Sequence, residues 1–299
     1  MFMLNSLGSF KRHMATLVGL IALPLALTPA LGQAAAPNEA VPARVITLAP
    51  HITELMFAAG ASAKVIATIN SSDHPAPARD LPRVGDGVQL NIEAVLAQHP
   101  DVLLAWAPTH TLRALMPTLS ASGIALQYSQ PAVVDEIPDE ILRFGQLFGT
   151  KETAIPVAAE LRQRLQTLRS RYAGRQPLSV FLDLGDTPLM TLGDDTLFNS
   201  VLALCGGVNL YADTGLPAPQ VSAEGVLSRN PDVVLVAASV GGSMRQTPWK
   251  ALGLPAALRN NLYAVNPDTL LRPGPRLIEA AEDVCRYIDE ARQDEARRQ

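Results

Sequence analysis

The sequence has no excess of basic residues and none of the short motifs that mark common catalytic sites. Lys and Arg total 24 against 28 Asp and Glu, a formal net charge of -4, so the chain lacks the positive field that nucleic-acid binding requires. It contains no G-x-S-x-G, H-E-x-x-H, G-x-x-x-x-G-K-S/T or G-x-G-x-x-G pattern. We therefore expect no nucleic-acid partner and no catalytic residues, and an enzyme would need a site without a local signature.

Histidine is scarce, which limits the metal sites that the chain can form. There are five histidines and no His-rich loop. A protein that binds a bare zinc or manganese ion needs three or four His, Asp or Glu ligands converging on one point. Beyond the N-terminal segment the histidines are His51, His74, His99 and His110, and His99 ends a predicted helix away from the loops considered below. We expect no resident metal or cofactor, with a bare-ion binder as an alternative.

The N-terminal segment lacks the uninterrupted run of about 20 apolar residues that a membrane-spanning helix needs. Basic residues at 11–13 precede an apolar stretch at 14–31, which two prolines interrupt, and small alanines follow at 34–36. This pattern is typical of a cleaved secretory signal peptide, here residues 1–36, with a membrane anchor as the alternative. No cysteine ends the apolar run to accept a lipid, so we expect a soluble periplasmic protein.

Only two cysteines are present, Cys205 and Cys285. In an oxidising compartment a pair with no other partner predicts a disulfide, which here closes a loop of about 80 residues and contributes ~4 kcal/mol by restricting the unfolded chain. Two buried free thiols are the alternative. Neither cysteine has a histidine beside it in the sequence, so a catalytic thiol is not expected.

An internal repeat divides the chain into two related halves. Residues 91–107, NIEAVLAQHPDVLLAWA, align without gaps on residues 222–238, SAEGVLSRNPDVVLVAA. Each copy predicts a short helix with a glutamate in its first turn, Glu93 or Glu224, a stop at Pro-Asp and then a continuous apolar strand. A strand without polar alternation is covered on both faces, which indicates a parallel α/β sheet in each half.

The rest of the pattern predicts two Rossmann-like lobes, at 43–150 and 178–292. The expected strands and helices around the repeat are strand 44–50, helix 53–59 and strand 124–128 in the first lobe, and strand 179–185, helix 198–205 and strand 262–265 in the second. Residues 151–174 predict one long connecting helix, whose apolar stripe is Ala154, Ala158, Leu161, Leu165, Leu168 and Tyr172. A surface helix packed on one lobe is the alternative for this segment.

Several of these segments resemble a known family. The stretches RVITLAPHITELMFAAG, LNIEAVLAQHPDVLLAW, LCGGVNLYAD and PQVSAEGVLSRNPDVVLV resemble class III periplasmic binding proteins of iron-siderophore, haem and cobalamin ABC importers, most of all the cobalamin-binding branch. The resemblance covers nearly all of residues 43–291. It implies a monomer without enzymatic activity that carries a metal chelate in a cleft between two lobes to an inner-membrane ABC permease. It also implies that Cys205 and Cys285 lie in disulfide-bearing segments.

The expected cargo site lies at the loops after the strands, because ligands of such folds bind there. These loops include the segment 239–243. From position and resemblance, the candidate contacts are His51, Asp73, His74, Gly87, Trp106, Met190, Ala218, Asp268 and Arg272. Trp106 resembles the family's cleft tryptophan and Arg272 its cleft arginine, while His74 stands where the family has an aromatic ring. Glu93 and Glu224 resemble the exposed carboxylates that dock onto arginines of the permease.

Each candidate also has a purely structural interpretation. His51 precedes a predicted helix and is otherwise a cap-region side chain, Trp106 is otherwise core filling, and the two repeat glutamates otherwise only stabilise their own helices. Phe198 and Trp249 are more typical of a core. The cobalamin branch rings its ligand with aromatic residues, but the matching positions here are Gly87, Met190, Ala218 and Thr269. The cargo therefore stays open between cobalamin or another corrinoid, a ferric siderophore and haem.

Overall fold

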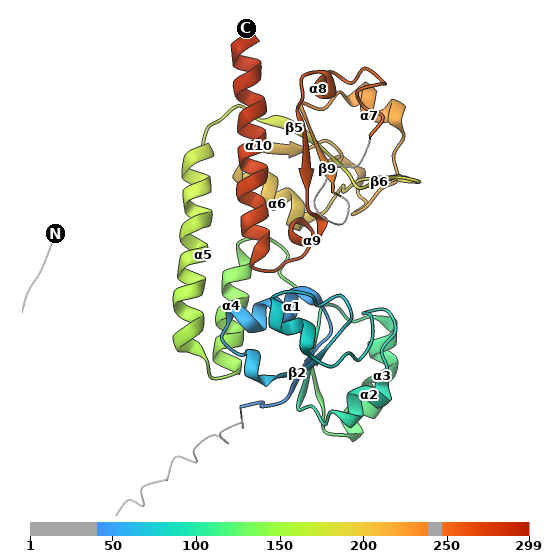
Figure 1. The fold of residues 1–299 in the computed structure, drawn as a ribbon, viewed down its shortest axis with the longest axis vertical. Helices are drawn as coiled ribbons and strands as arrows, with labels where there is room; N and C mark the ends of the chain where they lie inside the picture. The colour runs from blue at the N-terminus through green and yellow to red at the C-terminus, as the bar shows by residue number, and fades with distance from the viewer. Residues whose placement is uncertain (1–40, 239–246, 299) are drawn as a thin grey trace, which may run out of the picture. The chain divides into compact units, whose positions relative to one another are not determined.

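Two α/β lobes make up the part of the chain that the computed structural model describes, residues 41–238 and 247–298 (Figure 1). The predicted signal peptide, residues 1–36, and the predicted cleft loop at 239–243 lie outside the described residues. Among the helices that the structure describes, none has the length and apolar character needed to cross a membrane.

The first lobe is built on a four-stranded parallel sheet, as the unbroken apolar strands predict. Its strands lie in the order β2-β1-β3-β4 and are β1 (Val45–Thr47), β2 (Val65–Thr68), β3 (Val102–Ala105) and β4 (Ala125–Tyr128). Every residue of β1 and β3 is buried, because helices cover both faces of the sheet.

The helices of the first lobe divide between the two faces of this sheet. They are α1 (Pro50–Ala58), η1 (Ser62–Lys64), η2 (Ala76–Asp80), α2 (Ile92–Ala97), α3 (His110–Ala121) and α4 (Glu136–Leu147). Val45 and Leu104 pack in the same apolar cluster as α1 and α4, whereas Ile46 and Leu103 pack in another with α2 and α3. Helix α1 begins at Pro50, three residues before the predicted start, since a proline is well tolerated in a first helical turn.

The second lobe repeats the same strand order. In its described part, four parallel strands lie in the order β10-β9-β5-β8, namely β5 (Leu178–Asp183), β8 (Gly207–Asn209), β9 (Val233–Ala237) and β10 (Leu262–Val265). A small hairpin, β6 (Gly185–Asp186) with β7 (Leu189–Met190), follows β5. The helical segments are α6 (Thr196–Leu204), η3 (Ala212–Thr214), α7 (Ala223–Arg229), α8 (Pro255–Leu258), α9 (Pro267–Leu270) and α10 (Arg276–Arg298).

The aspartate of the Pro-Asp-Val repeat explains why both halves keep this motif. Asp101 Oδ2 accepts hydrogen bonds from the backbone N–H groups of Ala43 and Arg44, at 2.7 and 2.9 Å, just before β1. Asp232 Oδ2 accepts from the backbone N–H and the hydroxyl of Ser179 in β5, at 2.8 and 2.7 Å. In each lobe this carboxylate therefore fixes the first strand beside the repeat strand that follows the aspartate.

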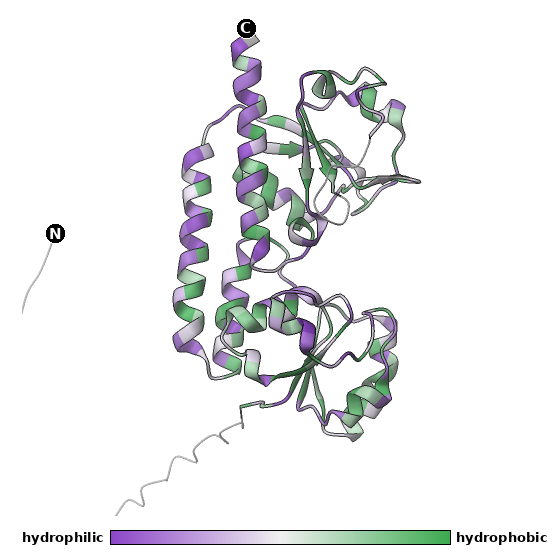
Figure 2. Ribbon diagram, viewed as in Figure 1, coloured by the Kyte–Doolittle hydropathy of each residue, from purple (hydrophilic) through white to green (hydrophobic). Residues whose placement is uncertain are grey.

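One long helix, α5 (Lys151–Tyr172), runs from the first lobe to the second, and the whole predicted apolar stripe on it is buried. It packs on α4 of the first lobe and on α6 and α10 of the second (Figure 1). Bidentate hydrogen bonds from Arg164 to Glu282, at 2.7 and 2.8 Å, join α5 to α10. A single cluster of buried apolar side chains extends through α1, α4, α5, α6 and α10, so the two lobes share a core. Figure 2 shows the complementary pattern, with hydrophilic residues along the outer faces of α5 and α10.

The two cysteines form the predicted disulfide. Cys205 follows α6 and Cys285 lies on α10, 80 residues away in the sequence, and both are fully buried. The bond therefore ties α6 to the helix that packs against it.

Candidate functional site

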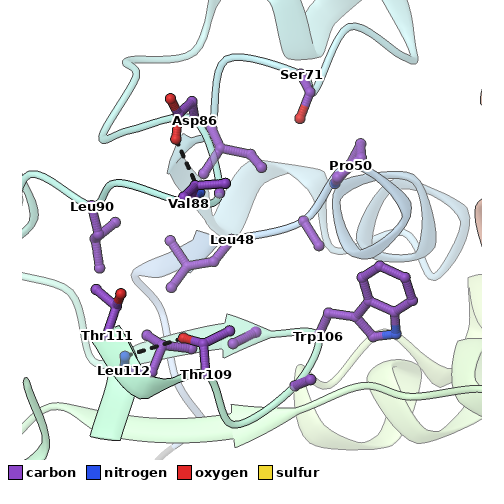
Figure 3. A pocket seen from close by; sticks show the side chains of 15 residues that line it. Leu48, Pro50, Ser71, Asp86, Val88, Leu90, Trp106, Thr109, Thr111 and Leu112 are labelled. Carbon is purple, nitrogen blue, oxygen red and sulfur yellow. Dashed lines mark hydrogen bonds between the residues drawn. The ribbon is translucent and has the colours of Figure 1, made fainter. Parts of the chain in front are cut away.

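The loops after β1 and β3 separate because the helices that follow these neighbouring strands cover opposite faces of the sheet. A crevice at such a point is where open α/β sheets bind ligands. The structure has a hollow of about 260 Å³ there, which we call the lobe-1 hollow (Figure 3). It is lined by Leu48, Ala49, Pro50, Ile69, Ser71, Asp86, Gly87, Val88, Leu90, Ala105, Trp106, Ala107, Thr109, Thr111 and Leu112.

A second hollow, of about 340 Å³, lies between the lobes, and we call it the interlobe hollow. The first lobe contributes Trp106, Pro131 and Ala132. The second lobe contributes Leu192, Asp195, Thr196, Leu197, Phe198, Leu270 and Leu271. Trp106 lines both hollows, so the two are adjacent spaces on either side of one indole.

Trp106 is 51% exposed, which is unusual for the largest apolar side chain at the end of a buried strand. The His51 ring packs edge-on against the indole, with the two ring centroids 5.3 Å apart. The exposed surface and the fixed ring orientation suit a stacking platform.

His51 lies in the first turn of α1, not ahead of the helix as predicted, and is only 1% exposed. Its Nε2 is 3.5 Å from the carbonyl oxygen of Ser129. Burial lowers the pKa of His51 from 6.5 to about 4, so the imidazole is neutral at pH 7. The structure thus places this side chain beneath Trp106 and away from the open surface of the hollows.

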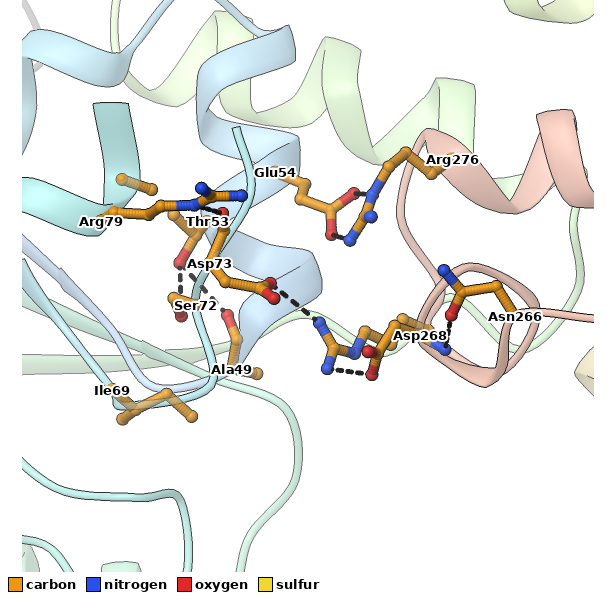
Figure 4. Close-up of polar contacts among 12 residues, drawn as sticks. Ala49, Thr53, Glu54, Ile69, Ser72, Asp73, Arg79, Asn266, Asp268 and Arg276 are labelled. Carbon is orange, nitrogen blue, oxygen red and sulfur yellow. Dashed lines mark hydrogen bonds and ion pairs between the residues drawn. The ribbon is translucent and has the colours of Figure 1, made fainter. Parts of the chain in front are cut away.

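Three more predicted residues meet between the lobes. Arg272 Nη1 lies 3.5 Å from Asp73 Oδ1, across the two lobes, and the same guanidinium forms an ion pair with Asp268 on α9 (Figure 4). Both carboxylates are more than half exposed, whereas the arginine side chain is 19% exposed. Arg272 is therefore held between two carboxylates.

A second contact between the lobes escaped the sequence analysis. Arg276, the first residue of α10, binds Glu54 on α1 through two hydrogen bonds of 2.9 and 2.6 Å (Figure 4). The Glu54 side chain is 4% exposed and that of Arg276 19%. The hydrogen bonds that Arg276 donates to the Glu54 carboxylate raise the pKa of Arg276 above its usual range. A charged residue among the buried residues of α1 was the available signal, but its partner is 222 residues away.

The sequence analysis also did not predict a cluster of buried hydroxyl groups in the first lobe. Thr47, Thr53, Thr68 and Ser72 are each 0% exposed. The hydroxyl oxygens of Thr47 and Thr53 are 2.7 Å apart, and those of Thr68 and Ser72 are also 2.7 Å apart. Further contacts of 2.9 to 3.1 Å join the two pairs. This cluster anchors Ser72, and with it the loop that carries Asp73 and His74.

The other predicted contacts are more scattered. Gly87 lines the lobe-1 hollow, and His74 is half-buried in the loop after β2. Met190 ends β7, and Ala218 is exposed in the loop between η3 and α7. Neither residue lines the two hollows described above. Trp249 is core, as expected, and its Nε1 donates to Asp183 at 2.7 Å. Phe198 is also buried, although one edge of it reaches the interlobe hollow.

The repeat glutamates occupy equivalent places on the two lobes. Glu93 and Glu224 are exposed in the first turns of α2 and α7, and the capping residues Asn91 and Ser222 each accept a 3.0 Å bond from a backbone N–H of the helix. Within residues 41–238 and 247–298, no three His, Cys, Asp or Glu side chains are placed to hold a metal ion.

Comparison with known proteins gives consistent results. The Periplasmic binding protein family profile matches residues 45–252. The Vitamin B12-binding protein of Vibrio cholerae serotype O1 is 38% identical over 266 residues, 88% of this chain and 94% of that protein. The Vitamin B12-binding protein of Yersinia pestis is 38% identical over 245 residues, 82% of this chain and 86% of that protein.

Solved structures agree with these matches. The periplasmic vitamin B12 binding protein BtuF of Vibrio cholerae has a TM-score of 0.75 at 36% identity, over 84% of this chain and 98% of that chain. The periplasmic heme-binding protein BhuT, with a TM-score of 0.71 at 22% identity over 83% of this chain and 98% of that chain, shares the fold. With two topologically equivalent lobes, a single connecting helix and these matches, the chain belongs to the periplasmic binding protein family.

Proposed function

We propose that this chain is a periplasmic solute-binding protein that carries a corrinoid, cobalamin in the first instance, to an inner-membrane ABC importer. The observation that carries the proposal is the 38% identity to vitamin B12-binding proteins over 88% of the chain. The two adjoining hollows around Trp106 support it, because they offer apolar surface and an exposed indole to a large ring system.

The charges around the interlobe hollow favour a corrinoid over haem. Asp195 lines this space, and Asp268, two residues before the lining residue Leu270, holds Arg272 together with Asp73. Haem would bring two propionates into this negative surrounding, which like charges disfavour. The corrin ring of cobalamin carries neutral amides at its periphery, whose N–H groups can donate to the carboxylates.

The proposal requires no catalysis by this chain. The interlobe hollow binds the chelate, and the shared apolar core together with the Glu54–Arg276 ion pair keeps the lobes in place, so cargo enters a largely preformed site. The loaded monomer then docks on a two-subunit permease through Glu93 and Glu224, one on each lobe. Export by residues 1–36 would bring the protein to the periplasm.

The test is isothermal titration of the mature protein, from residue 37, with cyanocobalamin, hemin, ferrichrome, Zn²⁺ and Mn²⁺. We expect one-to-one binding of cyanocobalamin that is tighter than that of every other probe. Replacement of the platform by Trp106→Ala should weaken it by about tenfold or more, or 1.4 kcal/mol. The matched control is Met116→Ala, which removes another exposed apolar side chain, 44% exposed and on α3.

The proposal is wrong if cyanocobalamin does not bind while hemin, ferrichrome or a bare ion does. Tight binding of ferrichrome would keep the transport role and replace the corrinoid with a siderophore. Tight binding of Zn²⁺ or Mn²⁺ alone would assign the chain to the bare-ion binders.

A further inference from the structure

Two arginines of the second lobe reach across to the first lobe from one short segment, residues 272–276. Arg272 contacts Asp73 on the loop after β2, and Arg276 contacts Glu54 on α1 (Figure 4). The sequence Pro-Gly-Pro separates the two arginines. We call residues 272–276 the clamp, because the segment attaches one lobe to the other at two points.

The spacer between the two arginines is stiff and lies directly on the first lobe. Its prolines fix the backbone angle φ, and the N–H of Gly274 donates to the carbonyl oxygen of Arg272 at 2.8 Å. A Cβ added to Gly274 would lie 3.2 Å from Oε2 of Glu54 and 3.5 Å from Cβ of His51. The backbone of the clamp therefore touches α1 without an intervening side chain, and its two arginines keep their spacing.

The two contacts of the clamp differ in strength. Arg276 makes two hydrogen bonds, of 2.9 and 2.6 Å, to a Glu54 carboxylate that is 4% exposed. Arg272 reaches Asp73 only at 3.5 Å, the limit for a hydrogen bond, and the Asp73 side chain is 57% exposed. A long, exposed ion pair contributes little, whereas breaking a buried one is costly. The contact with Glu54 is therefore a fixed attachment, and the contact with Asp73 is a labile one.

Asp268 makes the labile contact reversible. It lies in the same lobe as Arg272, four residues earlier, and forms an ion pair with the same guanidinium. If the lobes part at this point, Arg272 keeps Asp268 as its partner and Asp73 is hydrated, so neither charge is left unpaired in an apolar surrounding. Parting at Glu54 would instead take the guanidinium from a buried carboxylate. The lobes therefore separate more easily at Asp73 than at Glu54.

The labile contact lies on the cargo side of the clamp. Asp73 is on a loop at the carboxyl edge of the first sheet, and Arg272 directly follows Leu271, which lines the interlobe hollow. Glu54 lies behind that edge, in the second turn of α1. The interlobe hollow is about 340 Å³, whereas an apolar cavity of roughly 150 Å³ is filled by one benzene molecule. A corrinoid therefore needs a wider space than the lobes enclose in this structure.

From these observations we infer that the clamp is a hinge with a latch. The lobes part by pivoting about the Glu54–Arg276 pair, and the Asp73–Arg272 contact is the latch that opens to admit the cargo and closes behind it. The role in admitting cargo rests on the proposed function, whereas the latch itself is a property of the cargo-free protein. The movement is confined to the edge that carries Asp73, so the rest of the site keeps its form.

The experiment measures the distance between the lobes in the cargo-free protein. Spin labels are attached to cysteines introduced by Thr118→Cys on α3 and Ser228→Cys on α7, both exposed sites, since the native cysteines are joined in the buried disulfide. Pulsed electron paramagnetic resonance is recorded for this labelled protein alone and with Asp73→Ala or Asp80→Ala added. Asp80→Ala is the matched control, because it removes an exposed carboxylate of the same lobe, at the end of η2.

We expect Asp73→Ala to increase the population of longer interlobe distances by about threefold or more, and Asp80→Ala to leave it unchanged. Raising NaCl from about 0.05 to about 1 M should have the same effect on the protein that keeps Asp73, because salt screens the latch, and none on Asp73→Ala. The urea midpoint of Asp73→Ala should equal that of the wild type, because the Glu54–Arg276 pair and the shared core still hold the lobes.

An unchanged distance distribution in Asp73→Ala would overturn the latch, as would a urea midpoint lowered as far as by Arg276→Leu. Addition of cyanocobalamin tests closure, since bound cargo should return Asp73→Ala to the shorter distances. Longer distances that persist with cyanocobalamin bound would overturn closure behind the cargo. Failure of cyanocobalamin to bind the wild type would overturn the proposed function, while the distances in the cargo-free protein still decide whether the latch exists.

Discussion

Replacement of Arg276 by leucine tests how strongly a single ion pair holds the two lobes together. The change leaves the Glu54 carboxylate, 4% exposed, without the guanidinium that makes two hydrogen bonds to it. Removing one partner of a buried pair costs about 3–5 kcal/mol. Because the Arg276 side chain is 19% exposed, we expect the lower end, about 3 kcal/mol. For a chain of this size that lowers the melting temperature by roughly 6–12 °C.

The assay is urea unfolding followed by circular dichroism at pH 7, with the double variant Glu54→Leu/Arg276→Leu beside the single one. The double variant should recover much of the lost stability, since it buries no unpaired charge. Arg286→Leu on the same helix is the control, because Arg286 is 52% exposed and its ion pairs should be worth less than about 1 kcal/mol. If Arg276→Leu costs no more than Arg286→Leu, the pair does not join the lobes energetically.

Three further results are expected. Replacing Cys205 and Cys285 by alanine should lower the free energy of unfolding by ~4 kcal/mol, measured in urea, because the disulfide closes a loop of 80 residues. Burial of the neutral His51 should contribute fully to the free energy of unfolding above pH 6.5. This free energy should fall by about 3 kcal/mol as the pH drops to about 4, because only the unfolded state gains a proton in that window. His51→Gln should flatten this pH dependence. Glu93→Arg with Glu224→Arg should abolish uptake into cells while leaving cargo affinity unchanged.

Control variants distinguish these specific effects from a general loss of stability or folding. His99→Asn removes an exposed histidine and should leave the pH dependence of unfolding as it is in the wild type. Glu152→Arg with Glu160→Arg makes the same change in net charge at exposed sites on α5 and should leave uptake intact. Normal uptake by the Glu93 and Glu224 variant, or a pH dependence that survives His51→Gln, would contradict the roles assigned to these residues.

Much of the architecture could be predicted because it depends on local patterns. The apolar stripe on residues 151–172 has the helical period, and each of its members proves to be buried. The repeat at 91–107 and 222–238 contains its own helix cap, helix stop and strand, so both copies form the same unit in each lobe. The disulfide needed only the count of cysteines and an oxidising compartment.

Contacts between distant segments could not be predicted in this way. Nothing near Glu54 in the sequence indicates Arg276, and the hydroxyl cluster forms only when Thr47, Thr68 and Ser72 meet at the ends of two strands. His51 was considered a cargo contact because it follows a strand, but the early start of α1 at a proline turns its ring beneath Trp106. Local sequence places a residue on an element, whereas the packing of elements decides which way its side chain faces.

The continuous apolar core has a consequence for how the two halves unfold. Each lobe keeps a complete sheet and its own aspartate to fix the first strand, so each has the outline of an independent domain. Yet α5 buries one face against both, and a chain cut before β5 would expose that face to water. The two halves are thus mutually dependent, and we expect them to unfold as a single cooperative body rather than as a pair.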